Sequence, residues 1–297
     1  MKKVQAAILG SGNIGMDLLY KLRNSKVLSC ECVIGRQENS ENLKKCREMG
    51  YRTSAKSIQE IIEHPACYDV VFDATSAEAH KVHASILKRM KKFVVDLTPA
   101  KEGRLCIPCL NGDECVNEDN VNMVTCGGQA TVPMAYAVTR EIGHADYVEI
   151  VATIASSSAG RATRDNIDEY IHTTALALRN FTGVAKTKAM IVLNPADPPI
   201  IMRNTLYVVA DGIKLERVTY AAERMEQEIQ KYVPGYSITV PPSLVKDNTL
   251  AMTVQVEGSG DFLPEYAGNL DIITCAAVEM AEKYAYENLL REERCPF

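Results

Sequence analysis

Two features are missing from the 297-residue sequence: a long apolar run and an extended basic cluster. No apolar stretch approaches the roughly 20 residues that a membrane-spanning helix needs. The longest basic cluster is "KRMKK" at 88–92, and the formal net charge is -5. This charge balance gives no reason to expect nucleic acid or an anionic membrane as a partner. We therefore expect a protein that acts on small molecules.

Cysteine is too sparse for a disulfide scaffold, since ten cysteines are spread over the whole chain. The N-terminal segment "MKKVQAAILGSGNIG" has a basic tip, but its apolar run is short and is interrupted by glycines, unlike a secretory signal. Both observations predict a cytoplasmic protein with reduced thiols.

Metal-binding patterns are also weak. The segment "CIPC" at 106–109 has metal or redox spacing, but no second C-x-x-C and no paired histidines accompany it. His80 and His83 lie on one face of an expected helix, where surface histidines are common. Asp73 and Thr75 end an expected strand and either line a cleft or cap the next helix. We expect no metal site.

A glycine motif opens the chain. Residues 4–9 read as a buried strand, Gly10, Gly12 and Gly15 form G-x-G-x-x-G, and apolar residues then recur at helical spacing. Glycines in this setting let the backbone approach a pyrophosphate at the positive end of a helix. The motif therefore predicts a dinucleotide-binding site.

Strands and helices alternate after this motif, which is typical of an α/β fold with a Rossmann-type parallel sheet. Strands are expected at 27–35, 68–75, 92–99 and 121–126, and helices at 40–50 and 77–90. Residues 100–120 are expected to be irregular. We assign residues 1–126 to a dinucleotide-binding domain, joined by a C-terminal helix at 271–297.

The remaining segment, 127–270, has long strands and few crossover helices, which indicates a second α+β domain with a mixed or antiparallel sheet. Such a sheet often forms a dimer interface, so we expect a homodimer contact here. Within the helix expected at 164–183, Tyr170 belongs to the apolar stripe that faces the core.

Cys126 stands between the last strand of the first domain and a helix that opens with "GGQA". The positive field of a helix N-terminus lowers a thiol pKa and favours the nucleophilic thiolate. Gly127 and Gly128 are expected to leave room for a substrate and free N–H groups for an oxyanion. Beside a nicotinamide, this arrangement predicts aldehyde oxidation through a thiohemiacetal and a thioester.

The second strand ends in "VIGRQENS", with Arg36 where an acid usually binds the ribose diol of NAD. An arginine there accepts a 2′-phosphate, or else it is a solvated charge. The cofactor is expected to be NAD, with NADP left open.

Five ordered blocks carry a family resemblance: "AILGSGNIGMDLLYKL", "NMVTCGGQATVPMAYAV", "SSSAGRATRDNIDEY", "VLNPADPPIIMRNT" and "GNLDIITCAA". Together they resemble the CoA-acylating acetaldehyde dehydrogenases of aromatic-degradation (meta-cleavage) pathways. The resemblance implies oxidation of a small aldehyde with coenzyme A and NAD to acyl-CoA and NADH, with Cys126 as nucleophile. It also implies a partner, an aldolase of the 4-hydroxy-2-oxovalerate type.

The same resemblance assigns the cofactor contacts to the glycine loop, to a central segment and to one asparagine near the C-terminus. These residues are Ser11, Gly12, Asn13, Ile14, Ser158, Ala159, Gly160, Arg161, Ala162, Thr163, Arg164, Asp165, Asn166 and Asn269.

The chain departs from the family pattern at Met16, around Arg161, and at Asn204. The family has an acid at the last of these positions, which helps to place or polarise the cysteine. Two alternatives remain open. One is a phosphate-dependent semialdehyde dehydrogenase or acyl-phosphate reductase, in which Arg161 and Arg164 bind phosphate. The other is a catalytically silent dinucleotide-binding protein.

Overall fold

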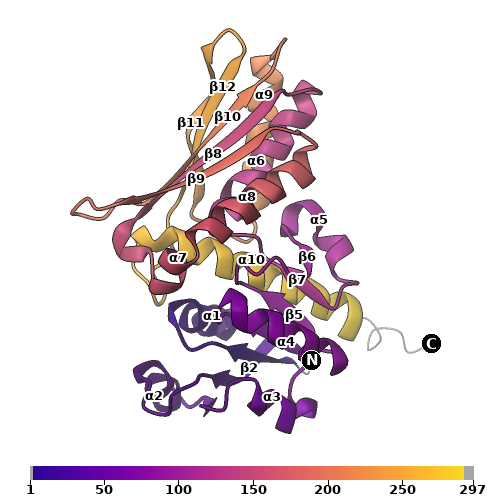
Figure 1. Cartoon of the computed structure of the whole chain (residues 1–297), viewed down its shortest axis with the longest axis vertical. Helices are drawn as coiled ribbons and strands as arrows, with labels where there is room; N and C mark the ends of the chain where they lie inside the picture. The colour runs from indigo at the N-terminus through magenta and orange to yellow at the C-terminus, as the bar shows by residue number, and fades with distance from the viewer. Residues whose placement is uncertain (1–2, 291–297) are drawn as a thin grey trace. The chain divides into compact units, whose positions relative to one another are not determined.

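The computed structural model describes residues 3–290, with only the backbone described for Arg161 and Ala162. The chain divides into two compact units: Met1–Met123 with Thr274–Phe297, and Val124–Ile273 (Figure 1). Positions 291–297 of the expected C-terminal helix lie outside the described residues. Within 3–290, no helix has the length and apolar character to cross a membrane.

The first unit contains a seven-stranded parallel sheet in the order β3-β2-β1-β4-β5-β7-β6. The α/β fold class expected from the alternating pattern is thus confirmed. The strands are β1 (Val4–Leu9), β2 (Leu28–Ile34), β3 (Arg52–Ser54), β4 (Val70–Asp73), β5 (Phe93–Asp96), β6 (Arg104–Leu105) and β7 (Asn120–Asn122).

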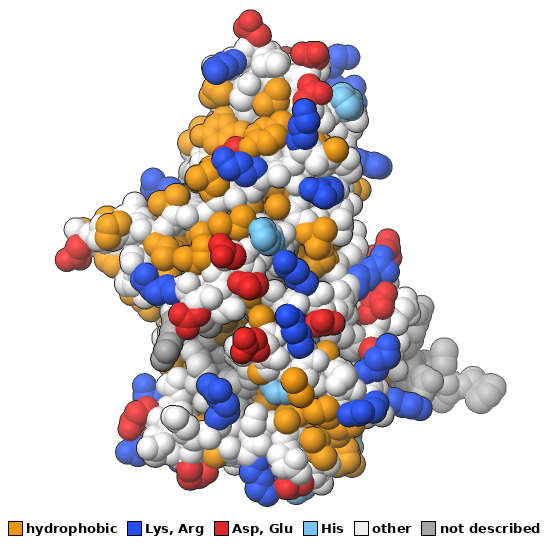
Figure 2. All heavy atoms as spheres, in the orientation of Figure 1, with side chains coloured by type: hydrophobic (Ala, Val, Ile, Leu, Met, Phe, Trp, Pro, Cys, Tyr) orange, Lys and Arg blue, Asp and Glu red, His pale blue; other side chains and the backbone are white. Residues whose placement is uncertain are grey.

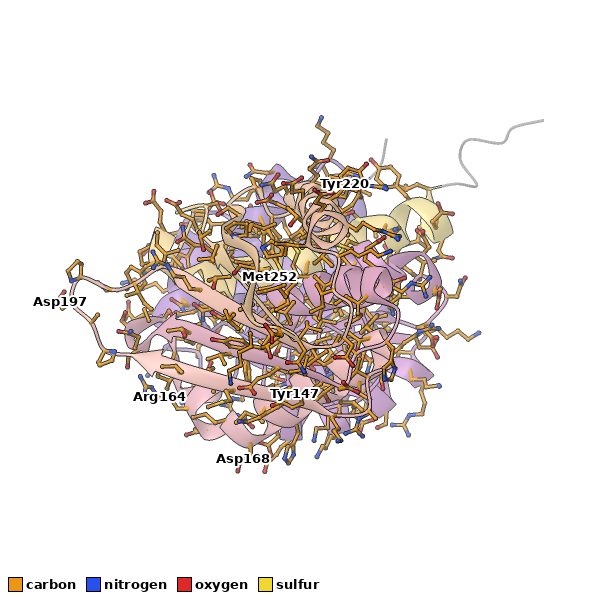
Figure 3. The ribbon with its side chains drawn as sticks, turned by 90° about the horizontal axis from the view of Figure 1, so that it is seen from above. Tyr147, Arg164, Asp168, Asp197, Tyr220 and Met252 are labelled. Atoms are coloured by element: carbon orange, nitrogen blue, oxygen red, sulfur yellow. The ribbon has the colours of Figure 1, made fainter. Side chains whose placement is uncertain are left out.

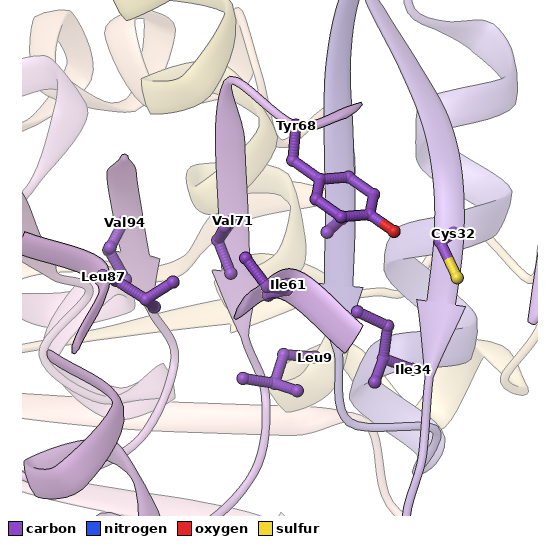
Figure 4. Close-up of a cluster of buried hydrophobic side chains, with 9 residues drawn as sticks. Leu9, Cys32, Ile34, Ile61, Tyr68, Val71, Leu87 and Val94 are labelled. Carbon is purple, nitrogen blue, oxygen red and sulfur yellow. The ribbon is translucent and has the colours of Figure 1, made fainter. Parts of the chain in front are cut away.

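Helices cover both faces of this sheet because its strands are apolar on both sides. The helices of this unit are α1 (Asn13–Asn24), α2 (Glu41–Glu48), α3 (Gln59–Glu63), α4 (Ala77–Arg89), α5 (Pro108–Cys115) and the part of α10 (Gly268–Tyr284) from Thr274 onward. Helix α1 packs over Ile8, and Thr274 of α10 donates a hydrogen bond to Asp17 of α1. On the other face, Ile61 of α3 and Leu87 of α4 join a core cluster with Leu9 (Figure 4).

Residues 100–120 are more regular than expected, because they contain β6 and α5. Pro108 occupies the first turn of α5, where a proline is tolerated. The Asn111 side chain accepts from the Ile107 N–H and donates to the Leu105 carbonyl, at 2.9 Å each. Side-chain hydrogen bonds of this kind leave neither an apolar periodicity nor a turn signal in the sequence, so the segment was not predicted to be regular.

The second unit contains a five-stranded mixed sheet in the order β11-β12-β10-β8-β9, in which only β8 and β9 pair in parallel. The expected second α+β unit with a mixed sheet is therefore confirmed. Its strands are β8 (Tyr147–Ala155), β9 (Thr187–Asn194), β10 (Met202–Val209), β11 (Tyr236–Lys246) and β12 (Thr249–Val256). Its helices are α6 (Cys126–Ile142), α7 (Arg161–Asp165), α8 (Ile167–Thr182), α9 (Leu215–Gln230) and the start of α10.

One face of this sheet is covered by α6, α8 and α9. Ile150 of β8 and Asn204 of β10 are buried on that side, where Asn204 bonds to Thr131 of α6. On the opposite face, Met190 and Val192 of β9 are about 40% exposed. The connection between β9 and β10 extends beyond the sheet, with Asp197 at its tip (Figure 3).

Candidate active site

The glycine loop of the first unit has the shape that a dinucleotide needs. Gly10 has φ +120°, and a Cβ there would lie 2.5 Å from the Ala74 carbonyl oxygen. A Cβ on Gly15 would lie 1.9 Å from the Gly10 carbonyl oxygen, whereas one on Gly12 would meet nothing within 4 Å. Two glycines are thus required for the tight turn and the close helix contact, and the middle one faces open space. This is the division of roles that a pyrophosphate-binding loop requires.

The four loop residues assigned by resemblance lie at this carboxyl edge of the sheet. Gly12 and Asn13 are exposed, and Ser11 and Ile14 are half-buried. The Ser11 carbonyl accepts a hydrogen bond from Asn42 Nδ2 at 2.8 Å, which ties the loop to α2. The loop is therefore held in place while its ligand-binding side stays open.

Cys126 is the first residue of α6, and not the last residue of a strand as expected, since β7 ends at Asn122. Thr125 caps the helix by accepting from the Gly128 N–H at 2.9 Å. Val124, just before the cap, has φ +61°. A β-branched residue in this region is strained, and strain of about 1–3 kcal/mol is typical of functional sites.

The thiol of Cys126 does not have the low pKa that its helix position predicts. Burial raises the pKa to about 11, although hydrogen bonds with the Tyr170 hydroxyl and the Gly127 N–H act in the opposite direction. The residue is only partly buried in surface terms, but its sulfur is desolvated. Loss of hydration outweighs the helix field here.

Tyr170 of α8 is the neighbour that the sequence analysis missed as a functional residue. Its hydroxyl lies 3.9 Å from Cys126 Sγ. It also fills the space beside Gly127, because a Cβ on that glycine would lie 2.0 Å from Tyr170 Oη. The expectation that Gly127 and Gly128 leave room for substrate was therefore wrong. Gly127 makes room for a tyrosine, and the Gly128 N–H is used by the Thr125 cap.

The central segment assigned by resemblance folds around one arginine. Arg164 donates from Nη2 to the Ser156 carbonyl and hydroxyl, at 2.8 Å each, and from Nε to the Ala159 carbonyl at 3.1 Å. Ser158 is buried and bonds to the Ala155 carbonyl, while Gly160 has open space around it. The side chains of Arg161 and Ala162 lie outside the described residues.

The rest of that segment, Thr163 to Asn166, completes α7 and the junction to α8 in the second unit. Asn269, in the first turn of α10, is 1% exposed, and its Oδ1 has no hydrogen-bond partner among the described residues. Asn204 Nδ2 donates to Thr131 Oγ1 at 2.8 Å, while its Oδ1 is also unpartnered there. The Oδ1 atoms of Asn204 and Asn269 thus accept no hydrogen bond from the described residues, and both residues lie in the same unit as Cys126.

The histidines of α4 are buried, so the expectation of surface histidines was wrong. The Nδ1 atoms of His80 and His83 both lie within hydrogen-bond distance of Asp73 Oδ2, at 2.9 and 2.8 Å. Asp73 Oδ1 accepts from the N–H and hydroxyl of Thr75. Asp73 is thus an internal hub, and helical spacing alone did not reveal that a carboxylate lay opposite the two rings.

No group of three or more metal-ligating side chains within residues 3–290 is arranged to hold a metal ion. His80 and His83 use their Nδ1 atoms on one carboxylate oxygen. The thiols of Cys106 and Cys115 hydrogen-bond to each other.

Three comparisons bear on this geometry. Residues 126–264 match the family described as "Prokaryotic acetaldehyde dehydrogenase, dimerisation". The chain is 46% identical over 294 residues to an acetaldehyde dehydrogenase of Bacillus cereus, covering 99% of this chain and 98% of that protein. It is 48% identical over 283 residues to an acetaldehyde dehydrogenase of Pectobacterium atrosepticum, covering 95% of each.

The fold is similar to that of aspartate semialdehyde dehydrogenase II from Vibrio cholerae, whose crystal structure is a complex with ASA. The TM-score is 0.67 over 97% of this chain and all of that one, at 14% sequence identity. At this identity the likeness shows the fold alone. The identity to whole acetaldehyde dehydrogenases is far higher and spans nearly the full chain, so this protein belongs to the acetaldehyde dehydrogenase family.

Proposed function

We propose that the protein is a CoA-acylating aldehyde dehydrogenase that converts acetaldehyde or another short aldehyde, coenzyme A and an oxidised nicotinamide dinucleotide to acyl-CoA and the reduced dinucleotide. The observation that carries this proposal is Cys126 at the first turn of α6, with the Tyr170 hydroxyl 3.9 Å from its sulfur. The family relationship and the fit of the glycine loop support it.

In the first step, the Cys126 thiolate attacks the aldehyde carbon to form a thiohemiacetal. Because the pKa of the free thiol is high, its proton must leave as the aldehyde is attacked, and the carbonyl oxygen takes up a proton to become the hydroxyl group of the thiohemiacetal. Tyr170 stabilises the developing thiolate by hydrogen bonding to the sulfur. The Gly127 N–H acts in the same direction.

In the second step, the thiohemiacetal carbon loses its hydrogen with both bonding electrons, its hydroxyl group releases a proton to solvent, and a thioester on Cys126 remains. When bound, a nicotinamide dinucleotide would supply the acceptor for this hydride. The Gly10–Gly15 loop and the start of α1 would hold its pyrophosphate against backbone N–H groups. In the last step, the thiol of coenzyme A attacks the thioester carbonyl, and Cys126 leaves as the free thiol.

The phosphate-dependent alternative needs cationic side chains free to bind an acyl phosphate. Arg164, one of the two candidates, already donates to Ser156 and Ala159. Its guanidinium therefore organises the polypeptide between β8 and α8. This observation counts against Arg164 as the residue that would bind the phosphate of an acyl phosphate.

The proposal also covers the oligomeric state, the cellular location and the source of the aldehyde. The family description of residues 126–264 names dimerisation, and the half-open face of the five-stranded sheet carries Met190 and Val192. A homodimer through this face would bury them. On the basis of the sequence resemblance, we place the enzyme in the cytoplasm and in aromatic degradation. Its aldehyde would come from an aldolase of the 4-hydroxy-2-oxovalerate type.

Mass spectrometry of the intact protein tests the chemistry. Mixing the enzyme with acetaldehyde and oxidised dinucleotide, without coenzyme A, should leave an acetyl group on Cys126 that coenzyme A removes. Cys126→Ala should form no adduct while still binding the dinucleotide, and Cys67→Ala, at another partly buried thiol, should behave as the wild type. An enzyme that transfers the acyl group to phosphate instead of coenzyme A would support the alternative. Absence of any adduct and of turnover would support the silent protein.

A further inference from the structure

The carboxyl end of β2 lies directly beside the glycine loop. The Gly10 N–H donates to the Ile34 carbonyl at 2.8 Å. A Cβ on Gly35 would lie 2.8 Å from Ser11 Oγ, so the chain passes close to the loop at this point. Residue 36 therefore follows at the edge of the sheet where dinucleotide-binding folds recognise the adenosine ribose.

Among the described residues, no carboxylate occupies the two positions that follow Gly35 at the end of β2. The segment after β2 reads Gly35, Arg36, Gln37. The first acid, Glu38, is bound by Arg47, whose Nη1 lies 3.2 Å from Glu38 Oε1 and whose Nη2 donates to the Glu38 carbonyl at 3.3 Å. An enzyme specific for NAD normally places an acid here, which also repels a 2′-phosphate.

Arg36 is exposed and has no ion pair or hydrogen bond within the part of the chain that the structure describes. Its neighbour Ser40, at the N-terminus of α2, makes no side-chain capping bond. The guanidinium is thus not used by the fold, in contrast to Arg47. A planar guanidinium suits bidentate binding of a phosphate group.

We propose that Arg36 binds the 2′-phosphate of the adenosine ribose and that the chain uses NADP in preference to NAD. The inference rests on the proposed function, because it specifies the dinucleotide of that site. Arg36 acts as a specificity-determining residue just after the end of β2.

Binding of adenosine fragments tests this independently of aldehyde chemistry. Isothermal titration calorimetry with adenosine 2′,5′-bisphosphate and with 5′-AMP should show tighter binding of the bisphosphate. Arg36→Ala should weaken the bisphosphate by about 10- to 100-fold, the range for loss of a charged hydrogen bond, and leave 5′-AMP nearly unchanged. Arg23→Ala, which removes an equal charge from the far end of α1, is the matched control.

Steady-state kinetics supply the second arm. The wild type should have a higher kcat/KM for NADP than for NAD, and Arg36→Asp should reverse that order by offering a carboxylate to the ribose diol. Preference of the wild type for NAD, or equal effects of Arg36→Ala on both fragments, would overturn the inference while leaving the proposed function intact. Tight bisphosphate binding without aldehyde oxidation would overturn the proposed function instead.

Discussion

Nδ1 of His80 lies 2.9 Å from Oδ2 of Asp73, and both residues are fully buried. On its other side, His80 Nε2 is 3.4 Å from Asp96 Oδ2 and 3.0 Å from Asn120 Nδ2. These contacts connect the carboxyl ends of β4 and β5 with β7. One buried imidazole therefore contacts residues of three neighbouring strands, at the carboxyl ends of β4 and β5 and at the first residue of β7.

This network predicts that the protein loses stability as the pH rises from about 4 through neutral. Burial raises the pKa of Asp96 to about 7. Burial lowers the pKa of His80, but the hydrogen bond to Asp73 and the charges of Asp96 and Asp73 raise it above 6.5 overall. Groups with a raised folded-state pKa stabilise the fold below their unfolded pKa, and this stabilisation disappears as the pH rises through the folded value. Melting temperatures measured from pH 4 to pH 9 should therefore fall between about pH 4 and pH 7 because of Asp96, and fall further above pH 6.5 because of His80.

The loss of stability at low pH has a separate cause. Burial raises the pKa of Asp73, but hydrogen bonds from His80 and His83 lower it to about 2 overall. Its stabilisation is present above about pH 4 and lost as the pH falls toward 2. Asp96→Asn should flatten the decline between about pH 4 and pH 7 and leave the loss of stability below pH 4 unchanged. A decline of unchanged steepness in Asp96→Asn would contradict the assignment.

The thiol of Cys126 should react slowly at neutral pH and faster as the pH rises. Because its pKa is about 11 in the free protein, the rate of iodoacetamide labelling should increase about tenfold per pH unit up to pH 10. Peptide mapping by mass spectrometry would follow this site alone. A rate that levels off near pH 7 would show that the thiolate is stabilised far more than the structure indicates.

Tyr170→Phe separates the role of the hydroxyl from that of the ring. Removing a hydrogen bond that lowers the Cys126 pKa should slow labelling at pH 8 by about tenfold, which corresponds to roughly one pKa unit. The kcat for aldehyde should fall in parallel, with melting temperature little changed. Tyr136→Phe on α6, where the ring lies under Arg140, is the control and should have no effect on either rate.

The glycines of the loop should respond differently to alanine. Gly15→Ala would place a Cβ 1.9 Å from the Gly10 carbonyl oxygen, so the melting temperature should fall strongly. Gly12→Ala meets no protein atom within 4 Å. It should therefore fold normally but bind dinucleotide at least tenfold more weakly, because the methyl group occupies the space of the pyrophosphate. Calorimetric melting and dinucleotide titration of the two variants measure both effects.

The sequence predicted the two sheets because each has a strong hydrophobic pattern. Runs such as 70–73, apolar on both faces, indicate a covered parallel sheet, and the alternation in β8 indicates a sheet with one covered face. Helix α5 escaped prediction because side-chain bonds from Asn111 support it.

Only the parts of the candidate site that follow a short sequence motif could be predicted. The glycine loop and Cys126 both belong to such motifs. Tyr170 looked like one member of a buried stripe, because nothing in the periodicity of α8 indicates which residue meets Cys126 across the fold. For the same reason, the sequence did not show that Asp73 lies within hydrogen-bond distance of His80 and His83. The desolvation of a thiol depends on how the chain packs around it. The sequence therefore predicted a lowered pKa for Cys126, whereas burial raises it.

The open face of the five-stranded sheet should carry the contact between two copies of the chain. Figure 2 shows apolar side chains gathered over the strands of this unit, and Met190 and Val192 of β9 are 39% and 40% exposed. Stable homodimers bury at least about 1,000 Å² in total, so the contact should extend over several strands of this face. A carboxylate placed in such an interface would be buried without a partner.

Met190→Asp combined with Val192→Asp should therefore convert a dimer to monomers without lowering the helix content. Analytical ultracentrifugation over a range of protein concentrations measures the change, and circular dichroism checks the fold. Tyr220→Asp is the matched control, because Tyr220 is 63% exposed but lies on α9, away from the strands (Figure 3). If the control dissociates and the double variant does not, the contact lies on the helical layer. A double variant that remains dimeric beside an unaffected control would place the contact away from β9.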